Sequence, residues 1–276
     1  MNYIELSCEV FPPRYTEIAM AAFSEYGFES FAENEKGFSG YIPEKLFNED
    51  NFKALELFGN KEIKVNYSIK KIPEQNWNAV WESNFEPVLI GNECYIRAPF
   101  HPALTGIKHE IIIEPKMSFG TGHHETTHMM VQLLLEQNIC GKDLLDMGCG
   151  TAVLAILAKK SGANKVLAID NDEWAFNNAK ENCERNGAEE IEVIQGDASA
   201  IGEKKFDLIL ANINRNVLTT DIPVYACALK RNGIILLSGF YEADLTIIKS
   251  KATQFGLRHL RYIAMNSWCA AAFTKE

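Results

Sequence analysis

The chain has 276 residues, of which 47% are hydrophobic and 23% charged, as in a folded protein long enough for two domains of ordinary size. Its formal net charge of −10 at pH 7 argues against sequence-independent nucleic-acid binding, because that binding needs clustered Lys and Arg side chains. An acidic surface instead attracts a basic partner over long range.

The seven cysteines are scattered and never form a C-x-x-C pair, which indicates reduced thiols and not a disulfide framework. No apolar run reaches the roughly 18 residues of a membrane span. The N-terminus also lacks the basic patch and apolar stretch of a signal peptide. We therefore expect a cytoplasmic protein that has no membrane contact.

The N-terminal quarter of the chain has mixed periodicity. Residues 3–10 alternate as a strand, and residues 14–26 follow a Pro-Pro pair with a helical pattern. A strand region rich in Gly and aromatic residues comes next, then a helix-like stretch at residues 45–58 and an alternating strand at residues 62–72. This order predicts a small α+β domain over residues 1–72.

Residues 73–86 carry Trp77 and Trp81, four positions apart and therefore on one face of a helix. We expect a linker helix here, with both indoles packed at a domain junction. The second domain is then residues 87–276.

From residue 142 onward, apolar strands and helices alternate, which predicts a parallel sheet covered on both faces. We expect strands at residues 143–147, 165–169, 191–195, 206–211 and 233–239, and helices at residues 152–161, 173–186, 218–230 and 243–255. Two further strands, residues 257–265 and 268–274, are separated only by Asn266-Ser267 and should pair as an antiparallel hairpin. The predicted fold class is α/β, a Rossmann-like seven-stranded sheet that ends in this hairpin.

The strongest local signal is a glycine-rich turn between the first strand and the first helix of this sheet, Asp146-Met147-Gly148-Cys149-Gly150-Thr151-Ala152. Gly148 and Gly150 leave room for a ligand to approach the backbone, and the helix start presents free N–H groups. A dinucleotide-binding turn would need a third glycine at position 153, where Val153 stands.

The turn instead matches D-x-G-x-G-x-G, with Ala152 in place of the last glycine. The Asp146 carboxylate would favour the cationic amino group and the sulfonium of S-adenosylmethionine.

Three later strands also end in polar residues. Asp170 lies about 20 residues beyond the turn, where a carboxylate can accept hydrogen bonds from both ribose hydroxyls. Asp197 is placed to meet the adenine edge, and Asn212 ends the fourth strand. Because ligands of open α/β sheets bind at the carboxyl ends of strands, these side chains and Asp146 should converge. Asp and Asn also serve as caps and turn residues, so that alternative stays open, most of all for Asp197.

A second motif points to different chemistry. The segment His124-Glu125-Thr126-Thr127-His128 formally matches the H-E-x-x-H signature of zinc proteases. Val131 stands where the extended pattern needs glycine, no third ligand is placed downstream, and a Rossmann-like sheet is the wrong context. A zinc protease is therefore a distant alternative.

The segment Phe119-Gly120-Thr121-Gly122-His123-His124-Glu125-Thr126-Thr127, together with the glycine turn, Asp170-Asn171-Asp172 and Asn212-Ile213, resembles the ribosomal protein L11 methyltransferase family. The resemblance covers nearly the whole chain. It implies S-adenosylmethionine as the cofactor, contacted by Thr127, Gly148, Asp170 and Asn212, with the Phe119–Gly122 loop as part of its lid.

The resemblance also implies that the N-terminal domain recognises a basic ribosomal protein, which is methylated on lysine side-chain and N-terminal amines. Methyl transfer to an amine needs orientation more than a strong base, because burial beside a sulfonium lowers the pKa of the amine. Asn212 is the candidate that orients this amine through its side-chain carbonyl. We expect a monomer.

Two departures from the family pattern are Ala152 and the pair Asn214-Arg215 after Asn212-Ile213. The main alternative is a methyltransferase that acts on another amine, of a small molecule or a nucleic acid. A flipped base would need stacking aromatic residues after Asn212, and none follow. A non-enzymatic docking protein with a vestigial cofactor site is a further alternative.

Overall fold

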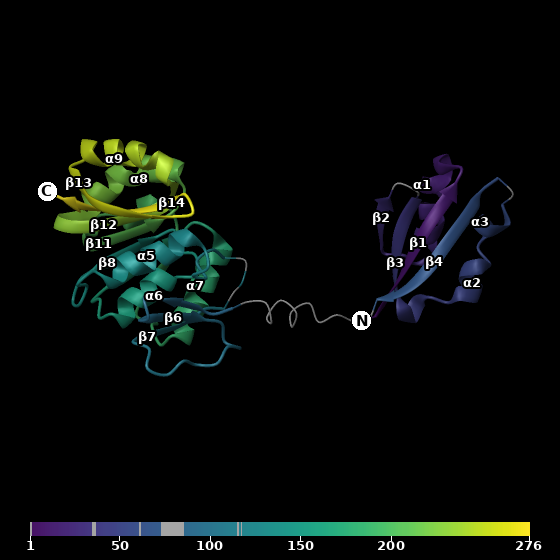
Figure 1. Ribbon diagram of the computed structural model, residues 1–276, viewed down its shortest axis with the longest axis horizontal. Helices are drawn as coiled ribbons and strands as arrows, with labels where there is room; N and C mark the ends of the chain where they lie inside the picture. The colour runs from purple at the N-terminus through teal and green to yellow at the C-terminus, as the bar shows by residue number, and fades with distance from the viewer. Residues whose placement is uncertain (1, 35–36, 61, 73–85, 115, 117) are drawn as a thin grey trace. The chain divides into compact units, whose positions relative to one another are not determined.

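The computed structural model describes residues 2–34, 37–60, 62–72, 86–114, 116 and 118–276 (Figure 1). The chain divides into two compact units, Met1–Phe85 and Glu86–Glu276, each with its own hydrophobic core. The linker helix expected over residues 73–86 lies outside the described residues, apart from Glu86. No helix in the described ranges is long and apolar enough to cross a membrane.

The N-terminal unit contains a four-stranded antiparallel sheet in the order β2-β3-β1-β4. Its strands are β1 (Tyr3–Phe11), β2 (Ser30–Asn34), β3 (Gly37–Pro43) and β4 (Lys64–Ile72), and its main helix is α1 (Thr16–Tyr26). Alternation along β1 buries Ile4, Leu6, Cys8 and Val10 against an aromatic cluster centred on Phe23.

The prediction of a single helix at residues 45–58 is wrong. The segment instead forms a 3-10 turn (Glu44–Leu46) and two short helices, α2 (Glu49–Lys53) and α3 (Glu56–Gly59). Asn48 has an extended backbone and its side chain accepts a hydrogen bond from the Asn51 N–H, so it starts a new helix. Leu55 has an extended ψ and separates α2 from α3.

The second unit confirms the predicted α/β class. Its seven-stranded sheet has the order β10-β9-β8-β11-β12-β14-β13, parallel from β10 to β12, with β14 antiparallel to both of its neighbours. The strands are β8 (Leu144–Met147), β9 (Val166–Asp170), β10 (Glu192–Gln195), β11 (Phe206–Asn212), β12 (Leu229–Tyr241), β13 (Leu257–Met265) and β14 (Trp268–Lys275). Asn266 and Ser267 both have positive φ, as a tight turn between paired strands requires.

Helices cover both faces of this sheet (Figure 1), and a hydrophobic core lies on each face. One core packs α5 (Glu125–Leu135), α6 (Val153–Lys160) and α7 (Glu173–Arg185), and the other packs α8 (Arg215–Ala228) and α9 (Leu245–Gln254). Along β8, Leu144 belongs to the first core, while Leu145 and Met147 belong to the second. Because side chains alternate along a strand, Asp146 therefore faces the α6 side.

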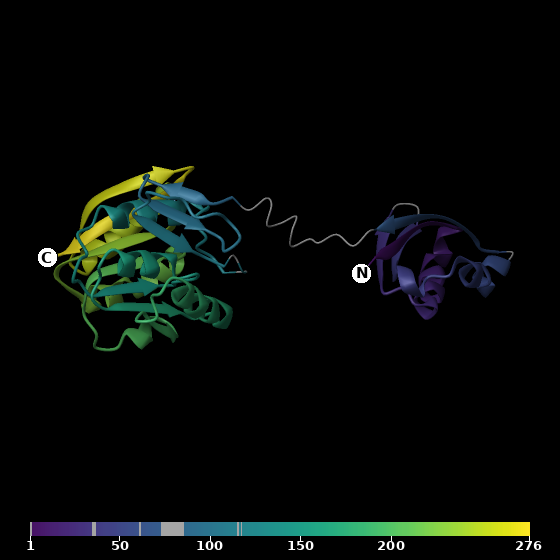
Figure 2. The same cartoon turned by 90° about the horizontal axis from the view of Figure 1, so that it is seen from below.

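A second, three-stranded sheet comes before α5 in the chain, with β5 (Val88–Ile90), β6 (Cys94–Arg97) and β7 (His109–Ile112) (Figure 2). The chain then passes through Ser118 and Phe119 to reach α5. This path brings the Gly-rich segment before α5 to the carboxyl end of β8.

Candidate functional site

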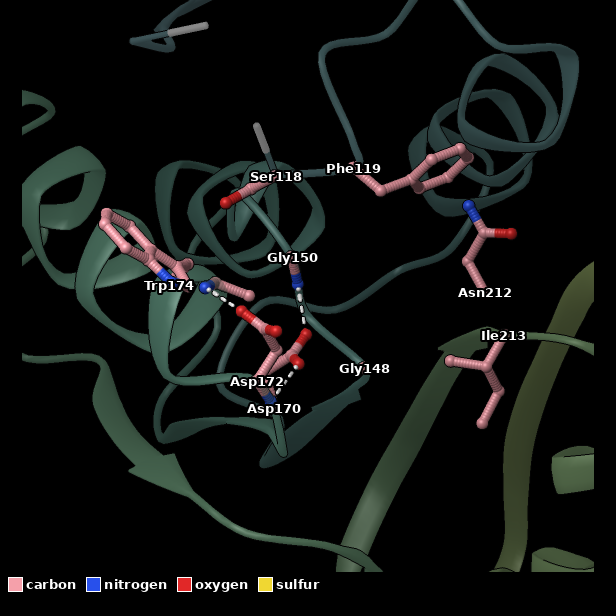
Figure 3. A pocket seen from close by; sticks show the side chains of 10 residues that line it. Ser118, Phe119, Gly148, Gly150, Asp170, Asp172, Trp174, Asn212 and Ile213 are labelled. Atoms are coloured by element: carbon pink, nitrogen blue, oxygen red, sulfur yellow. Dashed lines mark hydrogen bonds between the residues drawn. The ribbon is translucent and has the colours of Figure 1, made fainter. Parts of the chain in front are cut away.

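A pocket of about 460 Å³ lies at the carboxyl ends of β8, β9 and β11, where ligands of open α/β sheets bind (Figure 3). Its volume lies within the range of small-molecule sites. It is lined by Ser118, Phe119, Gly148, Gly150, Asp170, Asp172, Trp174, Ala175, Asn212 and Ile213.

The glycine turn after β8 forms one wall of the pocket. Gly148 and Gly150 have φ of +68° and +54°, in the left-handed region. A Cβ on Gly150 would lie 2.3 Å from the carbonyl oxygen of Phe119, and one on Gly148 would lie 2.2 Å from Cγ2 of Ile213. Ala152 takes the same left-handed conformation, with φ of +62°, so the chain tolerates a Cβ at the third position of the motif but not at the first two.

Asp170 lies at the carboxyl end of β9 and is nearly buried, with 8% of its surface exposed. Its Oδ2 accepts a hydrogen bond from the Gly150 N–H at 2.8 Å, and its Oδ1 accepts one from the Asp172 N–H at 3.1 Å. An ionised carboxylate has about four acceptor positions, so acceptor capacity remains for a ligand in the pocket.

Asp146 does not line the pocket. It is 1% exposed, and its Oδ2 accepts a hydrogen bond from the Ala155 N–H at 3.0 Å, in the first turn of α6. Burial raises the pKa of Asp146 to about 7, against the lowering effect of the Ala155 hydrogen bond. The one hydrogen bond described for this side chain is therefore to the helix that follows the turn, while its contact with a cationic cofactor group stays a prediction.

Asp197 is exposed and also lies outside the pocket lining. Its Oδ1 accepts hydrogen bonds from the Ser199 N–H at 2.9 Å and the Ser199 hydroxyl at 2.6 Å, which caps the 3-10 turn Ala198–Ile201. The structure thus gives Asp197 the capping role that the sequence left open.

Asn212 ends β11 and lines the pocket beside Ile213. Its Nδ2 donates to Oγ1 of Thr127 at 3.4 Å, and Thr127 is 1% exposed in the first turn of α5. The Asn212 Oδ1 is buried and has no hydrogen-bond partner in the described part of the chain. A buried acceptor without a partner costs about 1–3 kcal/mol.

The segment before α5 contributes Phe119 to the pocket, whereas Gly120, Thr121 and Gly122 do not line it. The carbonyl oxygens of Phe119 and Gly120 accept hydrogen bonds from the Thr151 N–H and hydroxyl, at 2.9 and 2.7 Å. Thr121 pairs instead with His123. Of the predicted four-residue loop, Phe119 alone lines the pocket, and Gly120 is held against the glycine turn.

A row of aromatic rings leads away from Phe119. The ring centroid of His124 lies 5.2 Å from that of Phe119 and 4.8 Å from that of Trp268, which in turn stacks on Tyr241 at 4.2 Å. Phe119 and Tyr241, the two ends of the row, are about half exposed.

The H-E-x-x-H segment is used differently from a zinc site. His124 is the N-cap of α5, and its Nδ1 accepts a hydrogen bond from the Thr126 N–H at 3.2 Å. No group of three His, Cys, Asp or Glu residues within the described ranges could hold a metal ion. The zinc-protease alternative therefore has no ligand set there.

Sequence reasoning missed Trp174, which lines the pocket in the first turn of α7 with 80% of its surface exposed. Figure 3 shows its indole on the side of Asp172, and Phe119 on the side of Asn212. The available signal was its position, four residues after Asp170 and two after the N-cap residue Asp172.

Comparison with known proteins gives consistent results. The family model for ribosomal protein L11 methyltransferase (PrmA) matches residues 16–276. Ribosomal protein L11 methyltransferases of Phocaeicola vulgatus and Porphyromonas gingivalis are 43% and 44% identical to this chain. The matches cover 99% of both chains for the first, and 94% of this chain and 91% of the relative for the second.

Among solved structures, the ribosomal protein L11 methylase of Lactobacillus delbrueckii subsp. bulgaricus superposes with a TM-score of 0.64 and 25% identity. It covers 70% of this chain and 99% of that chain. A methyltransferase of Pyrococcus furiosus, at 22% identity and a TM-score of 0.51, shares the fold over 60% of this chain and 89% of that chain.

Proposed function

Since the chain belongs to the ribosomal protein L11 methyltransferase (PrmA) family, we propose that it transfers methyl groups from S-adenosylmethionine to lysine side-chain and N-terminal amines of ribosomal protein L11. The single observation that carries this proposal is the buried, unpartnered Oδ1 of Asn212 at the edge of the pocket. It is an acceptor for the N–H of an incoming amine.

The residues present fit the cofactor. Gly148 and Gly150 allow close approach to the backbone, and Asp170 keeps acceptor capacity for the ribose hydroxyls. Thr127 stands behind Asn212 and holds its amide, so we assign Thr127 to positioning and not to direct contact. Asp146 likewise acts as a positioning residue that ties the glycine turn to α6.

When bound, the cofactor supplies a methyl group on a cationic sulfonium. The protein contributes orientation, because an in-line displacement needs the amine lone pair aimed along one axis. With its Nδ2 directed to Thr127, the Asn212 amide presents Oδ1 as the acceptor for one amine N–H. The amine must be neutral, and burial at the pocket lowers its pKa by disfavouring the charged form.

The aromatic row supports an approach path for the amine. Its rings run from Phe119 in the pocket wall to the half-exposed Tyr241. Aromatic faces attract a lysine ammonium group, which then transfers its proton to solvent water nearer to the pocket.

The N-terminal residues 1–72 recognise the ribosomal protein in this proposal, and the net charge of −10 favours a basic partner. Residues 73–86 link this part to the catalytic part, residues 87–276. The enzyme acts as a monomer in the cytoplasm, without reading nucleic acid directly.

The proposal is tested by transfer of a radiolabelled methyl group from S-adenosylmethionine to purified ribosomal protein L11, with Asp170→Ala as the control. We expect label on the ribosomal protein with the wild-type enzyme, and loss of label in the variant at limiting cofactor. If calorimetry shows cofactor binding but no label appears, the substrate is another amine, of a small molecule or a nucleic acid.

A further inference from the structure

Two fully buried polar residues connect the pocket wall to α7. Asn182, on α7, accepts a hydrogen bond from the Glu114 N–H on its Oδ1 at 2.9 Å. Its Nδ2 donates to the carbonyl oxygen of Thr151 at 3.1 Å. One amide therefore binds the segment before Ser118 and the glycine turn at the same time.

Thr151 continues this connection to the pocket. Its N–H donates to the Phe119 carbonyl at 2.9 Å and its hydroxyl donates to the Gly120 carbonyl at 2.7 Å. Phe119 is itself a lining residue, and it is half exposed, with its ring against that of His124. The backbone carbonyls of this wall are thus held by Thr151, and the Phe119 ring is in contact with His124.

Asn186, the C-cap residue of α7, makes comparable bonds to β7, and its Nδ2 also donates to the Asn182 carbonyl at 2.8 Å. Its Oδ1 accepts from the Ile112 N–H at 2.9 Å, and its Nδ2 donates to the Ile112 carbonyl at 2.7 Å. These bonds hold the end of β7 and do not involve the glycine turn. The Arg185–Glu114 ion pair lies on the exposed surface, where such pairs contribute little.

We infer that Asn182 and Thr151 are positioning residues that hold Phe119 and the glycine turn in the arrangement that binds the cofactor. The inference rests on the proposed function, in that S-adenosylmethionine occupies this pocket. If the competent arrangement is populated only in part, the apparent dissociation constant rises in inverse proportion to that fraction. Loosening this connection should therefore raise the cofactor Kd and KM more than it lowers kcat.

The first test compares Asn182→Leu with the control Asn186→Leu. Each variant removes one amide that pairs with a backbone N–H and a backbone carbonyl, and Asn182→Leu also removes the 3.4 Å hydrogen bond to Asn178 Oδ1. Titration calorimetry with S-adenosylhomocysteine measures affinity, and thermal unfolding measures stability. Both variants should lower Tm. We expect Asn182→Leu to raise Kd about tenfold with kcat at saturating cofactor within about twofold, while Asn186→Leu changes Kd less than twofold.

If Asn182→Leu does not fold, a second pair of variants, at Thr151, tests the same inference. Thr151→Val keeps the shape of the side chain but loses the hydroxyl bond to Gly120, whereas Thr151→Ser keeps that bond. The valine variant should weaken binding several-fold and the serine variant should restore it. Equal affinity of the valine variant and the wild type, or equal weakening by Asn182→Leu and Asn186→Leu, overturns the inference. If the wild-type enzyme itself fails to bind S-adenosylhomocysteine, the proposed function fails instead.

Discussion

The Asp170 carboxylate accepts the Gly150 N–H at 2.8 Å, so the acid at the end of β9 and the glycine turn after β8 form one rigid corner of the pocket. The two residues are 20 positions apart in the chain. The same glycine lies against the Phe119 carbonyl, so the corner leaves no space for a Cβ.

Gly150→Ala should abolish cofactor binding. The new Cβ would lie 2.3 Å from the Phe119 oxygen, and an alanine at a φ of +54° is strained in addition by about 1–2 kcal/mol. Calorimetry with S-adenosylhomocysteine checks this prediction. Ala152→Gly is the control, since it removes a Cβ that the structure accommodates in the same conformation, and it should leave affinity unchanged within about threefold. Wild-type affinity in Gly150→Ala would contradict the geometry of the corner.

Asn212→Ala should lower kcat about 100-fold, because a misplaced nucleophile loses its alignment with the methyl group. The Kd of S-adenosylhomocysteine should change less than about threefold, since the orienting contact is to the amine. Thr127→Val removes the acceptor for Nδ2 and should give a smaller loss, about tenfold, which Thr127→Ser should recover. Single-turnover kinetics with saturating cofactor separates these effects from binding. Full turnover by Asn212→Ala would remove this residue from the mechanism.

The buried Asp146 predicts a specific pH dependence of stability. Its pKa is about 7 in the folded protein, above the value of about 4 for an unfolded chain. Between these values the folded state holds a proton that the unfolded state has lost, so the free energy of unfolding falls as pH rises. The decrease is about 1.4 kcal/mol per pH unit, and it ends near pH 7.

Asp146→Asn keeps an acceptor for the Ala155 N–H and should flatten this slope between about pH 4 and 7. Denaturant unfolding at several pH values measures the slope of the free energy of unfolding against pH. Asp143 gives the matched control: burial raises its pKa, but the hydrogen bonds from Lys230 and Asn164 lower it more. Its stabilising effect is therefore lost only as pH falls below about 4, so Asp143→Asn should leave the slope above that pH intact. An unchanged slope in Asp146→Asn would show that other groups cause the pH dependence of the free energy of unfolding.

Trp174 should report cofactor binding. Its indole is 80% exposed and lines the pocket, so a bound ligand should shield it and change its fluorescence. Trp174→Phe should remove most of that change and raise Kd a few-fold through loss of contact area. A fluorescence change that persists in Trp174→Phe would assign the signal to another indole, such as Trp268.

The sequence predicts the seven-stranded sheet well, because buried strands and their connecting helices have distinct periodicities. It also brings Asp170 and Asn212 to one pocket, since strand ends converge by topology. The place of Asp146 outside the pocket lining could not be predicted, because nothing in the local pattern says which face of β8 the helix α6 covers. The break at Asn48 was missed because a cap residue inside a helical pattern looks like an ordinary polar position.

Long-range contacts explain most of the remaining differences between the predictions from the sequence and the structure. Asn182 bonds to residues 31 and 68 positions away, and its polar side chain in α7 gives no sign of these partners. The place of Trp174 in the pocket lining was also not predicted. An aromatic residue at the start of a helix suggests a buried packing contact more readily than a position at the rim of a pocket.

The order of strands has a consequence for how the protein is made. β14 enters the sheet between β12 and β13, although it follows both of them in the chain. While the chain is being synthesised, the sheet from β10 to β12 can form, but β12 keeps an open edge and β13 has no neighbour to pair with. The catalytic unit is therefore completed in one late step, in which Trp268 arrives beside His124. A chain interrupted before that step would present an unpaired strand edge, which is prone to aggregation.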